Sequence, residues 1–102
     1  MIYEERVYKS AAARRGQFIE FYGKEVIPRL TKYGAKVIGA WETLIGDRSQ
    51  VIILLAFNDM SERMKCWDTF HEDSDFNRQR PSLPQESVTV SILRPLKYSP
   101  MQ

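Results

Sequence analysis

The run of residues 51–57 limits the folds open to this chain more than any other part of its sequence. All seven positions are apolar, in the order Val-Ile-Ile-Leu-Leu-Ala-Phe. A run of this length that does not alternate in polarity is typical of a strand covered on both faces, and it is short for a buried helix. We therefore expect helices to cover one face of its sheet and a second copy of the chain to cover the other.

The order of the elements follows from the spacing of apolar residues, which changes between a period of two and a period of about 3.6. These periods predict strands at residues 2–9, 35–45, 50–57 and 86–93, and helices at about 13–33 and 60–71. This βαββαβ order is that of a ferredoxin-like α+β fold, with a four-stranded antiparallel sheet and two helices on one face. The first and third strands would be central, and sheet-to-sheet pairing of two copies would give a dimeric α/β barrel.

Several residues mark the ends of the predicted helices. Pro28 lacks an N–H, so a kink or a restart is expected there, and Gly34 suits a left-handed ending. Asp59 and Glu62 have the spacing of a capping box. A turn or short helix is expected around Phe76. The inward stripe of the second helix is expected to comprise Met60, Met64, Trp67 and Phe70 or His71.

The composition is that of a soluble globular protein, with 43% hydrophobic and 27% charged residues. Without repeats or linkers, residues 1–102 are expected to form a single domain, of which 94–102 are an extended, proline-containing tail. The net charge of +2 is spread along the chain, which argues against nucleic acid as a partner. No stretch approaches the ~20 apolar residues that span a bilayer. The acidic N-terminus lacks the pattern of a targeting peptide, so we expect a cytoplasmic protein without a membrane partner.

An ordered set of short motifs extends over nearly the whole chain. It comprises Tyr3-Glu4 with Arg6 and Tyr8, Ile27-Pro28, Tyr33-Gly34, Gly39, Trp41, Gly46, Phe57, Arg63, Arg94-Pro95-Leu96 and Tyr98-Ser99-Pro100. In these motifs and spacings the chain resembles a NIPSNAP domain, although Ala12-Ala13 stands where that family usually has Pro-Gly. The resemblance implies a dimeric α/β-barrel fold and a homodimer. Related barrel families include cofactor-free monooxygenases and isomerase-like proteins, but a shared fold transfers no mechanism.

Charged residues occur in the first strand, which is expected to be central. Glu4, Arg6 and Tyr8 share one face of it. An unpaired charge in a dry interior is costly, so these side chains must be paired, hydrated or functional. In one interpretation Arg6 pairs with Glu4 or a neighbour and sets the sheet register. In the other, the three are candidate catalytic residues on a cavity wall, where Arg6 holds an anionic ligand and Tyr8 or Glu4 moves protons.

A pocket between sheet and helices is expected to have a largely aromatic lining. Its candidate lining residues are Trp41, Phe18, Tyr22, Met64 and Trp67. Such a lining suits an aromatic or largely apolar organic molecule. Alternation places Val37, Gly39 and Trp41 on one face of their strand, so Trp41 could equally belong to the core.

Few residues could supply metal or nucleophile chemistry. His71 is the only histidine and Cys66 the only cysteine, so a zinc site built from several such ligands is excluded. His71 is expected to be exposed or half-buried, with haem ligation as the alternative. Cys66 lies about 140° from it around a helix and is expected to serve packing. Motifs for phosphate and dinucleotide binding are absent, and we expect no cofactor and no metal.

Arg63 follows the start of the second helix by one turn. It could form a surface salt bridge with Asp59, which would contribute little stability. Alternatively, it could pair with Glu4 or Glu42 across a dimer.

These observations favour a NIPSNAP-like homodimer that binds a small, largely apolar or aromatic molecule between sheet and helices. It could act on that molecule as a cofactor-free enzyme of oxygenase or isomerase type. The alternative is a non-catalytic protein-interaction module of the same fold, which recognises another protein through its surface.

Overall fold

The computed structural model describes residues 1–79 and 87–102 of the chain. The strands are β1 (Ile2–Lys9), β2 (Lys36–Glu42), β3 (Gln50–Phe57) and β4 (Ser87–Leu93). The helices are α1 (Ala12–Phe21), α2 (Ile27–Lys32), α3 (Met60–His71) and α4 (Ser74–Gln79), and a π-helical turn, η1 (Tyr22–Val26), joins α1 to α2. The predicted order of elements is confirmed, and the short helix α4 carries Phe76. The predicted start of the last strand at residue 86 lies outside the described residues.

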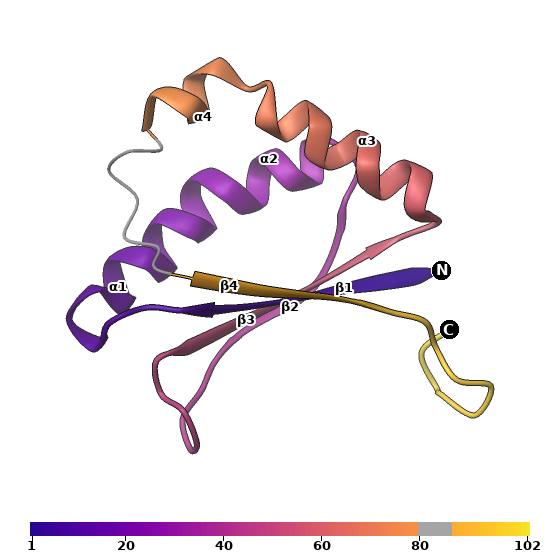
Figure 1. Cartoon of the computed structure of the whole chain (residues 1–102), viewed down its shortest axis with the longest axis horizontal. Coiled ribbons are helices and arrows are strands. Elements are labelled where there is room, and N and C mark those ends of the chain that lie inside the picture. Colours follow the sequence, from indigo (N-terminus) through magenta and orange to yellow (C-terminus); the bar gives the residue numbers. More distant parts are fainter. Residues whose placement is uncertain (80–86) are drawn as a thin grey trace.

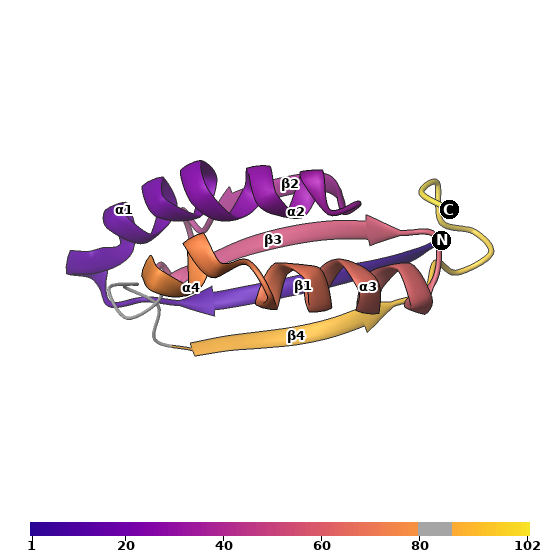
Figure 2. The same cartoon turned by 90° about the horizontal axis from the view of Figure 1, so that it is seen from above.

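The four strands form one antiparallel sheet in the order β2-β3-β1-β4, so β1 and β3 are central as predicted. Figure 1 shows the helices together on one face of this sheet. From above, the segment formed by α1, η1 and α2 lies beside the segment formed by α3 and α4 (Figure 2). The α+β fold with helices on one face is therefore confirmed. The opposite face, called the open face below, is covered by no helix of the described residues.

The register of the central strands separates two environments. The helix-covered face carries Glu4, Arg6 and Tyr8 of β1 opposite Leu55, Ile53 and Val51 of β3. The three β3 side chains belong to the buried core. On the open face, Ile52 and Leu54 are only half-buried. The strand is thus apolar on both faces, but within one copy of the chain only one face is fully covered.

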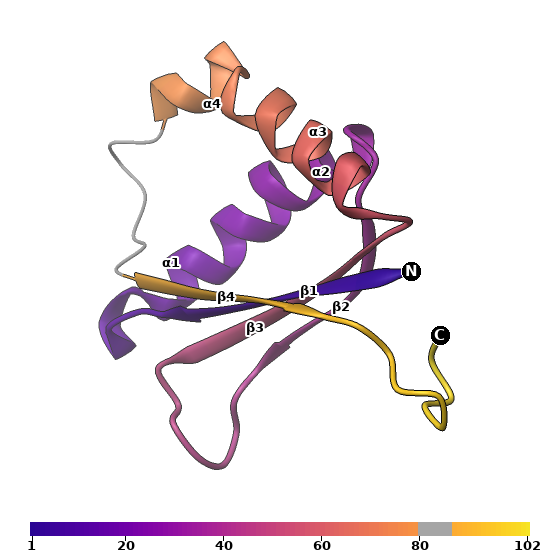
Figure 3. The ribbon, with the colours of Figure 1, turned by 45° about the vertical axis from the view of Figure 1, so that its right-hand side comes forward.

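The residues after β4 turn beneath one end of the sheet (Figure 3). The hydroxyl of Tyr3, on the open face, donates to the carbonyl of Gln102 at 2.9 Å. A turn closed from the N–H of Ser99 to the carbonyl of Leu96 shapes this tail. The tail therefore shields the end of the open face where β1 begins.

The first helical segment changes from α to π and back to α before it ends at Gly34. Pro28 lies at the start of α2, directly after η1, which is the restart predicted at this proline. The N–H of Ala35 donates to Leu30 and that of Gly34 to Thr31, the two bonds of a Schellman ending. Gly34 has a φ of 107°, as its predicted left-handed conformation requires.

Strand β2 differs from the prediction in length and in the faces of its side chains. It ends at Glu42 and not at residue 45. The register shifts between Val37 and Gly39, so that Val37 lies on the helix-covered face while Trp41 lies opposite Ile52 on the open face. The prediction that Val37 and Trp41 share a face is wrong, because one extra residue at a bulge reverses the alternation after it.

Helix α3 begins as predicted but is rotated from the predicted orientation. The carboxylate of Asp59 accepts from the N–H of Glu62 at 2.9 Å, the capping bond expected. The buried residues of the helix are Cys66, Trp67 and Phe70. Met60 and Met64 are 43% and 55% exposed, so the prediction that they belong to the inward stripe of this helix is wrong. Polar contacts determine this orientation of the helix. Arg63 and Trp67, on the neighbouring face of α3, both donate hydrogen bonds to the carboxylate of Glu4 in β1.

Candidate functional site

The buried carboxylate of Glu4 organises the polar side chains beneath α3. Glu4 is 0% exposed. Its Oε2 accepts from Nη1 of Arg6 at 2.6 Å, and its Oε1 accepts from Nε of Arg63 at 2.7 Å and from Nε1 of Trp67 at 3.1 Å. Arg63 therefore pairs with Glu4 of its own chain, not across a dimer. Because both oxygens are occupied, Glu4 ties β1 to α3 and holds Arg6 in one orientation.

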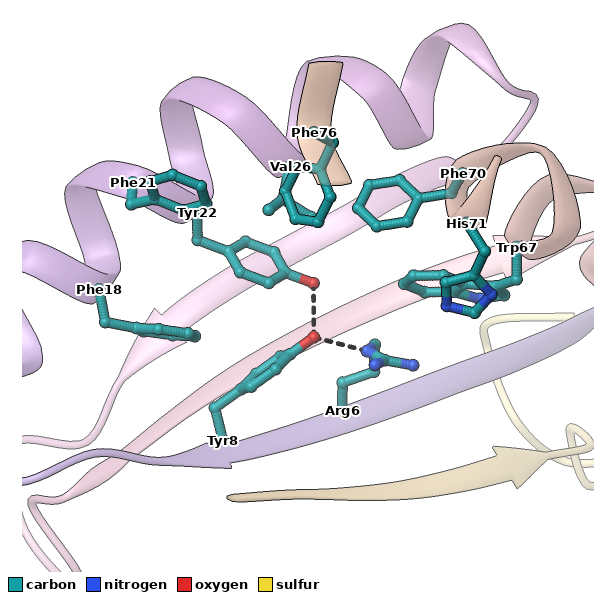
Figure 4. A pocket seen from close by; sticks show the side chains of 10 residues that line it. All are labelled: Arg6, Tyr8, Phe18, Phe21, Tyr22, Val26, Trp67, Phe70, His71 and Phe76. Atoms are coloured by element: carbon teal, nitrogen blue, oxygen red, sulfur yellow. Dashed lines mark hydrogen bonds between the residues drawn. The ribbon is translucent and has the colours of Figure 1, made fainter. Parts of the chain in front are cut away.

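Arg6 connects this carboxylate to two tyrosines. Its Nε donates to the hydroxyl of Tyr8 at 2.7 Å, and its guanidinium carbon lies 4.2 Å from the centre of the Trp67 ring. The hydroxyl of Tyr8 lies 2.9 Å from that of Tyr22, on η1. Figure 4 shows these hydrogen bonds from Arg6 through Tyr8 to Tyr22. A continuous hydrogen-bonded chain thus runs from the sheet to the first helical segment.

A cavity of about 400 Å³ lies around this chain of hydrogen bonds. Its lining comprises Arg6, Tyr8, Phe18, Phe21, Tyr22, Val26, Trp67, Phe70, His71 and Phe76. In Figure 4 the polar ends of Arg6 and both tyrosines meet in the middle of a ring of apolar side chains. The volume is within the range of about 300–1,000 Å³ typical of small-molecule sites. Among these residues Arg6 carries the only permanent charge.

Nη2 is the part of the Arg6 guanidinium that is left for a ligand. The hydrogen bonds of Arg6 to the described residues use Nε and Nη1. In the described part of the chain, no buried side-chain nitrogen or oxygen lacks a partner. Nη2 is therefore not fully buried, and Arg6 is one of the residues that line the cavity.

Burial and hydrogen bonding act in opposite directions on the charged groups. Burial raises the pKa of Glu4, but hydrogen bonds from Arg63 and Arg6 more than offset it, so this pKa lies below its usual value. Burial likewise lowers the pKa of Arg6, but its contacts with Tyr8, Tyr22 and Glu4 raise it overall. Burial is also the main reason that the pKa of Tyr22 lies well above 10.0. At neutral pH Glu4 is ionised, Arg6 is positive and Tyr22 is neutral.

Helix α4 supplies part of the cavity wall and is held by one carboxylate. Asp73 accepts from Nε of Arg29 at 3.0 Å, from the hydroxyl of Tyr33 at 2.6 Å and from the N–H of Phe76 at 3.0 Å. The ring of Phe76 lies 4.6 Å from that of Phe70. Asp73 thus joins the turn between α3 and α4 to α2 and places Phe76 against the cavity.

The structure brings together most of the predicted site residues. Glu4, Arg6 and Tyr8, the candidate catalytic residues, form one hydrogen-bonded group. Three of the five predicted lining residues, Phe18, Tyr22 and Trp67, do line the cavity beside that group.

Trp41 and Met64 do not line this cavity. Trp41 is 52% exposed, and its indole lies across Gly39, so close that a Cβ on that glycine would be 2.4 Å from the ring. Trp41 instead borders a separate groove of about 330 Å³ between β2 and the first helical segment. Met64 is turned outward because Arg63 and Trp67 occupy the inner side of α3. The bulge in β2 therefore explains the position of Trp41, and the rotation of α3 explains that of Met64.

Five further lining residues were not among the predicted pocket residues. They are Phe21, Val26, Phe70, His71 and Phe76. Val26 continues the i, i+4 stripe of Phe18 and Tyr22, so helical spacing could have identified it. His71 is exposed, as expected, but its ring lies 6.0 Å from that of Trp67 at the cavity rim. No local sequence pattern predicts that Phe76, in α4, lines the cavity.

Two other kinds of site are absent from the described part of the chain. Within residues 1–79 and 87–102, no three His, Cys, Asp or Glu side chains are grouped so that they could hold a metal ion. In the same residues, no helix combines the length and the apolar character needed to cross a membrane.

Three solved structures show what this chain is similar to. A NIPSNAP family protein from Agrobacterium tumefaciens shares 27% identity with a TM-score of 0.90, over 99% of this chain and 98% of that one. An uncharacterised NIPSNAP domain protein from Burkholderia xenovorans shares 25% identity with a TM-score of 0.86, over 98% and 99%. A Streptomyces coelicolor monooxygenase, solved with the ligand nanaomycin D, has 10% identity and a TM-score of 0.67, over 96% and 89%. The similarity to the monooxygenase shows a shared fold and nothing further.

The comparison of sequences points to one family. A search of curated proteins finds no match. The NIPSNAP family model matches residues 3–100, and this range includes the β1 residues of the buried cluster and Arg63. The chain therefore belongs to the NIPSNAP family.

Proposed function

We propose that the cavity beside Arg6 binds a small, largely apolar organic molecule. The observation that carries this proposal is the cavity of about 400 Å³, whose lining combines aromatic and aliphatic side chains with Arg6, His71 and the hydroxyls of Tyr8 and Tyr22. A few polar groups converging in an apolar space are the usual composition of a small-molecule site. The rings would pack against the body of the ligand, while the polar ends of Arg6 and Tyr8 orient it.

In this proposal the chemistry belongs to Tyr8, and Glu4 is a positioning residue. The hydroxyl of Tyr8 accepts from Nε of Arg6, lies 2.9 Å from the hydroxyl of Tyr22 and lines the cavity, so its proton can be shared with Tyr22 or with a ligand. Tyr8 could therefore give its proton to one atom of the ligand and take a proton from another, which leaves the tyrosine unchanged. A reaction that only moves a proton between two atoms of the ligand, as an isomerase does, needs no other reactant. Glu4 acts through Arg6, because its own oxygens are occupied.

Binding can be tested with 2-naphthamide, a neutral aromatic probe, in isotope-labelled protein. The two indole N–H resonances serve as the readout, because Trp67 lines the cavity and Trp41 lies on the open face. We expect the probe to shift the Trp67 resonance and leave that of Trp41 in place, with Trp41→Phe providing the assignment. Val26→Phe fills the cavity and should abolish the shift.

The matched control is Leu44→Phe, at a position that is 71% exposed in the loop after β2. It should leave the Trp67 shift unchanged. A Trp67 response that survives Val26→Phe, or equal responses of both tryptophans, would contradict binding in this cavity.

We further propose that two copies pair through their open faces. This proposal is supported by the apolar side chains there, half-buried Ile52 and Leu54 and exposed Trp41. Burying an aliphatic side chain contributes roughly 1.5–3 kcal/mol before ordering costs are subtracted. Sedimentation equilibrium should give a dimer for the wild type and for Leu44→Lys, and a monomer for Ile52→Lys. A wild-type monomer at micromolar concentration would refute the pairing.

A further inference from the structure

The charges of Glu4, Arg6 and Arg63 do not balance. Arg6 and Arg63 share the single carboxylate of Glu4, so the three groups carry one net positive charge. The side chain of Arg63 is 25% exposed and is partly hydrated, whereas that of Arg6 is 13% exposed and lies over the Trp67 ring. The unmatched charge is therefore least hydrated at Arg6, which lines the cavity.

No other lining side chain neutralises this charge. The other titratable lining groups are Tyr8, Tyr22 and His71. Burial keeps the pKa of Tyr22 well above its ordinary value, so its hydroxyl stays protonated. Histidine is either neutral or positive, never negative. Because only 13% of the Arg6 side chain is exposed, its charge is poorly solvated, and an anion that enters the cavity would compensate it.

The geometry of Arg6 indicates which anion fits. Nε and Nη1 are engaged by Tyr8 and Glu4, so the accessible Nη2 offers its N–H groups from one side of the guanidinium. Hydrogen bonds from a guanidinium to an anionic oxygen are among the stronger ones in proteins. One net charge is matched by one negative charge, which favours a carboxylate or phenolate over a doubly charged phosphate. The surrounding phenyl and indole rings favour an aromatic body.

We infer that the ligand of this cavity is a monoanionic aromatic acid whose charged oxygen accepts hydrogen bonds from Nη2 of Arg6. This inference rests on the proposed binding function and adds to it the charge and the class of the ligand.

The test compares 2-naphthoate with 2-naphthamide, which have the same ring system and differ in charge. Both are titrated at one pH while the Trp67 indole resonance is followed. We expect 2-naphthoate to bind the wild type at least about tenfold more tightly. Arg6→Met should remove this preference, whereas Arg6→Lys keeps the charge and should retain part of it. Lys65→Met removes a positive charge from the exposed side of α3 and should leave the preference unchanged.

The outcomes separate this inference from the binding function on which it rests. Equal affinities of the two probes for the wild type would contradict the inference that the ligand is an anion, but would not contradict binding in the cavity. No Trp67 response to either probe would overturn both. A preference for 2-naphthoate that persists in folded Arg6→Met would overturn the role of Arg6. If Arg6→Met does not fold, the comparison of wild type with Arg6→Lys decides, because a preference tied to the guanidinium must weaken in the lysine variant.

Discussion

Glu4 Oε1 accepts a hydrogen bond from Nε of Arg63 at 2.7 Å, across 59 positions of sequence. The same oxygen accepts from Trp67, so one side chain of β1 determines which face of α3 meets the sheet. This ion pair is the link between the fold and the candidate site, because Glu4 also orients Arg6.

Replacing Glu4 should therefore cost stability well beyond the loss of a surface ion pair. Glu4→Ala leaves Arg6 without its counter-charge and the indole N–H of Trp67 without its acceptor, and we expect a loss of about 3–5 kcal/mol in the free energy of unfolding. Urea denaturation measures it. The control is Glu42→Gln, whose partly exposed pair with Arg15 spans 3.4 Å and should contribute less than about 1 kcal/mol. A loss from Glu4→Ala as small as that of the control would contradict the organising role of Glu4.

The hydrogen bonds and the ion pair of Asp73 predict how the free energy of unfolding depends on pH in acid. Hydrogen bonds from Tyr33 and from the N–H of Phe76, with the ion pair to Arg29, lower the pKa of Asp73 from 3.8 to about 2. Because the unfolded chain takes up this proton first, the contribution is fully present above the unfolded value and is lost as the pH falls from about 4 toward 2. Asp73→Asn should flatten the fall of the urea midpoint in that window.

Asp68→Asn provides the control for the acid experiment. This residue is exposed on α3, and its substitution removes the same charge. The variant should keep the wild-type dependence on pH. If Asp73→Asn also keeps the wild-type dependence on pH, the carboxylate of Asp73 does not hold α4 in place as the structure indicates.

Two glycine substitutions should change stability in opposite directions. Gly34 has a φ of 107° at the end of α2, so Gly34→Ala should destabilise the protein by about 1–2 kcal/mol. Gly16 lies inside α1, and a Cβ added there would meet no atom of the described residues outside the helix within 4 Å. Gly16→Ala should therefore stabilise the protein by up to about 1 kcal/mol. Thermal unfolding monitored by circular dichroism measures both. Equal signs would show that backbone conformation at Gly34 does not control the ending of the helix.

The thiol of Cys66 should react only when the structure opens. It is 1% exposed, and burial raises its pKa, so both access and thiolate formation are reduced. We expect a disulfide reagent to modify it far more slowly in the native protein than in urea. Lys65→Cys in a Cys66→Ser background places a thiol on the exposed side of the same helix and should react quickly without denaturant. Equal rates for the two native proteins would contradict the burial of Cys66.

The periodicity of the chain is sufficient to predict the element order, the central positions of β1 and β3, and the common face of Glu4, Arg6 and Tyr8. These features follow from local geometry, because side chains alternate along a strand and a fully apolar strand must lie inside a sheet. The ending at Gly34 and the capping bond from Asp59 are local in the same sense. Each depends on residues that are neighbours in the sequence.

Other features required contacts between distant segments. The bulge that turns Trp41 to the open face is a property of the pairing between β2 and β3, and the alternation of residues along β2 does not place it. The outward position of Met64 follows from bonds between α3 and β1, which outweigh the burial of a flexible apolar side chain. Sequence periodicity describes each element alone, whereas the faces that elements turn toward each other depend on where buried charges find their partners.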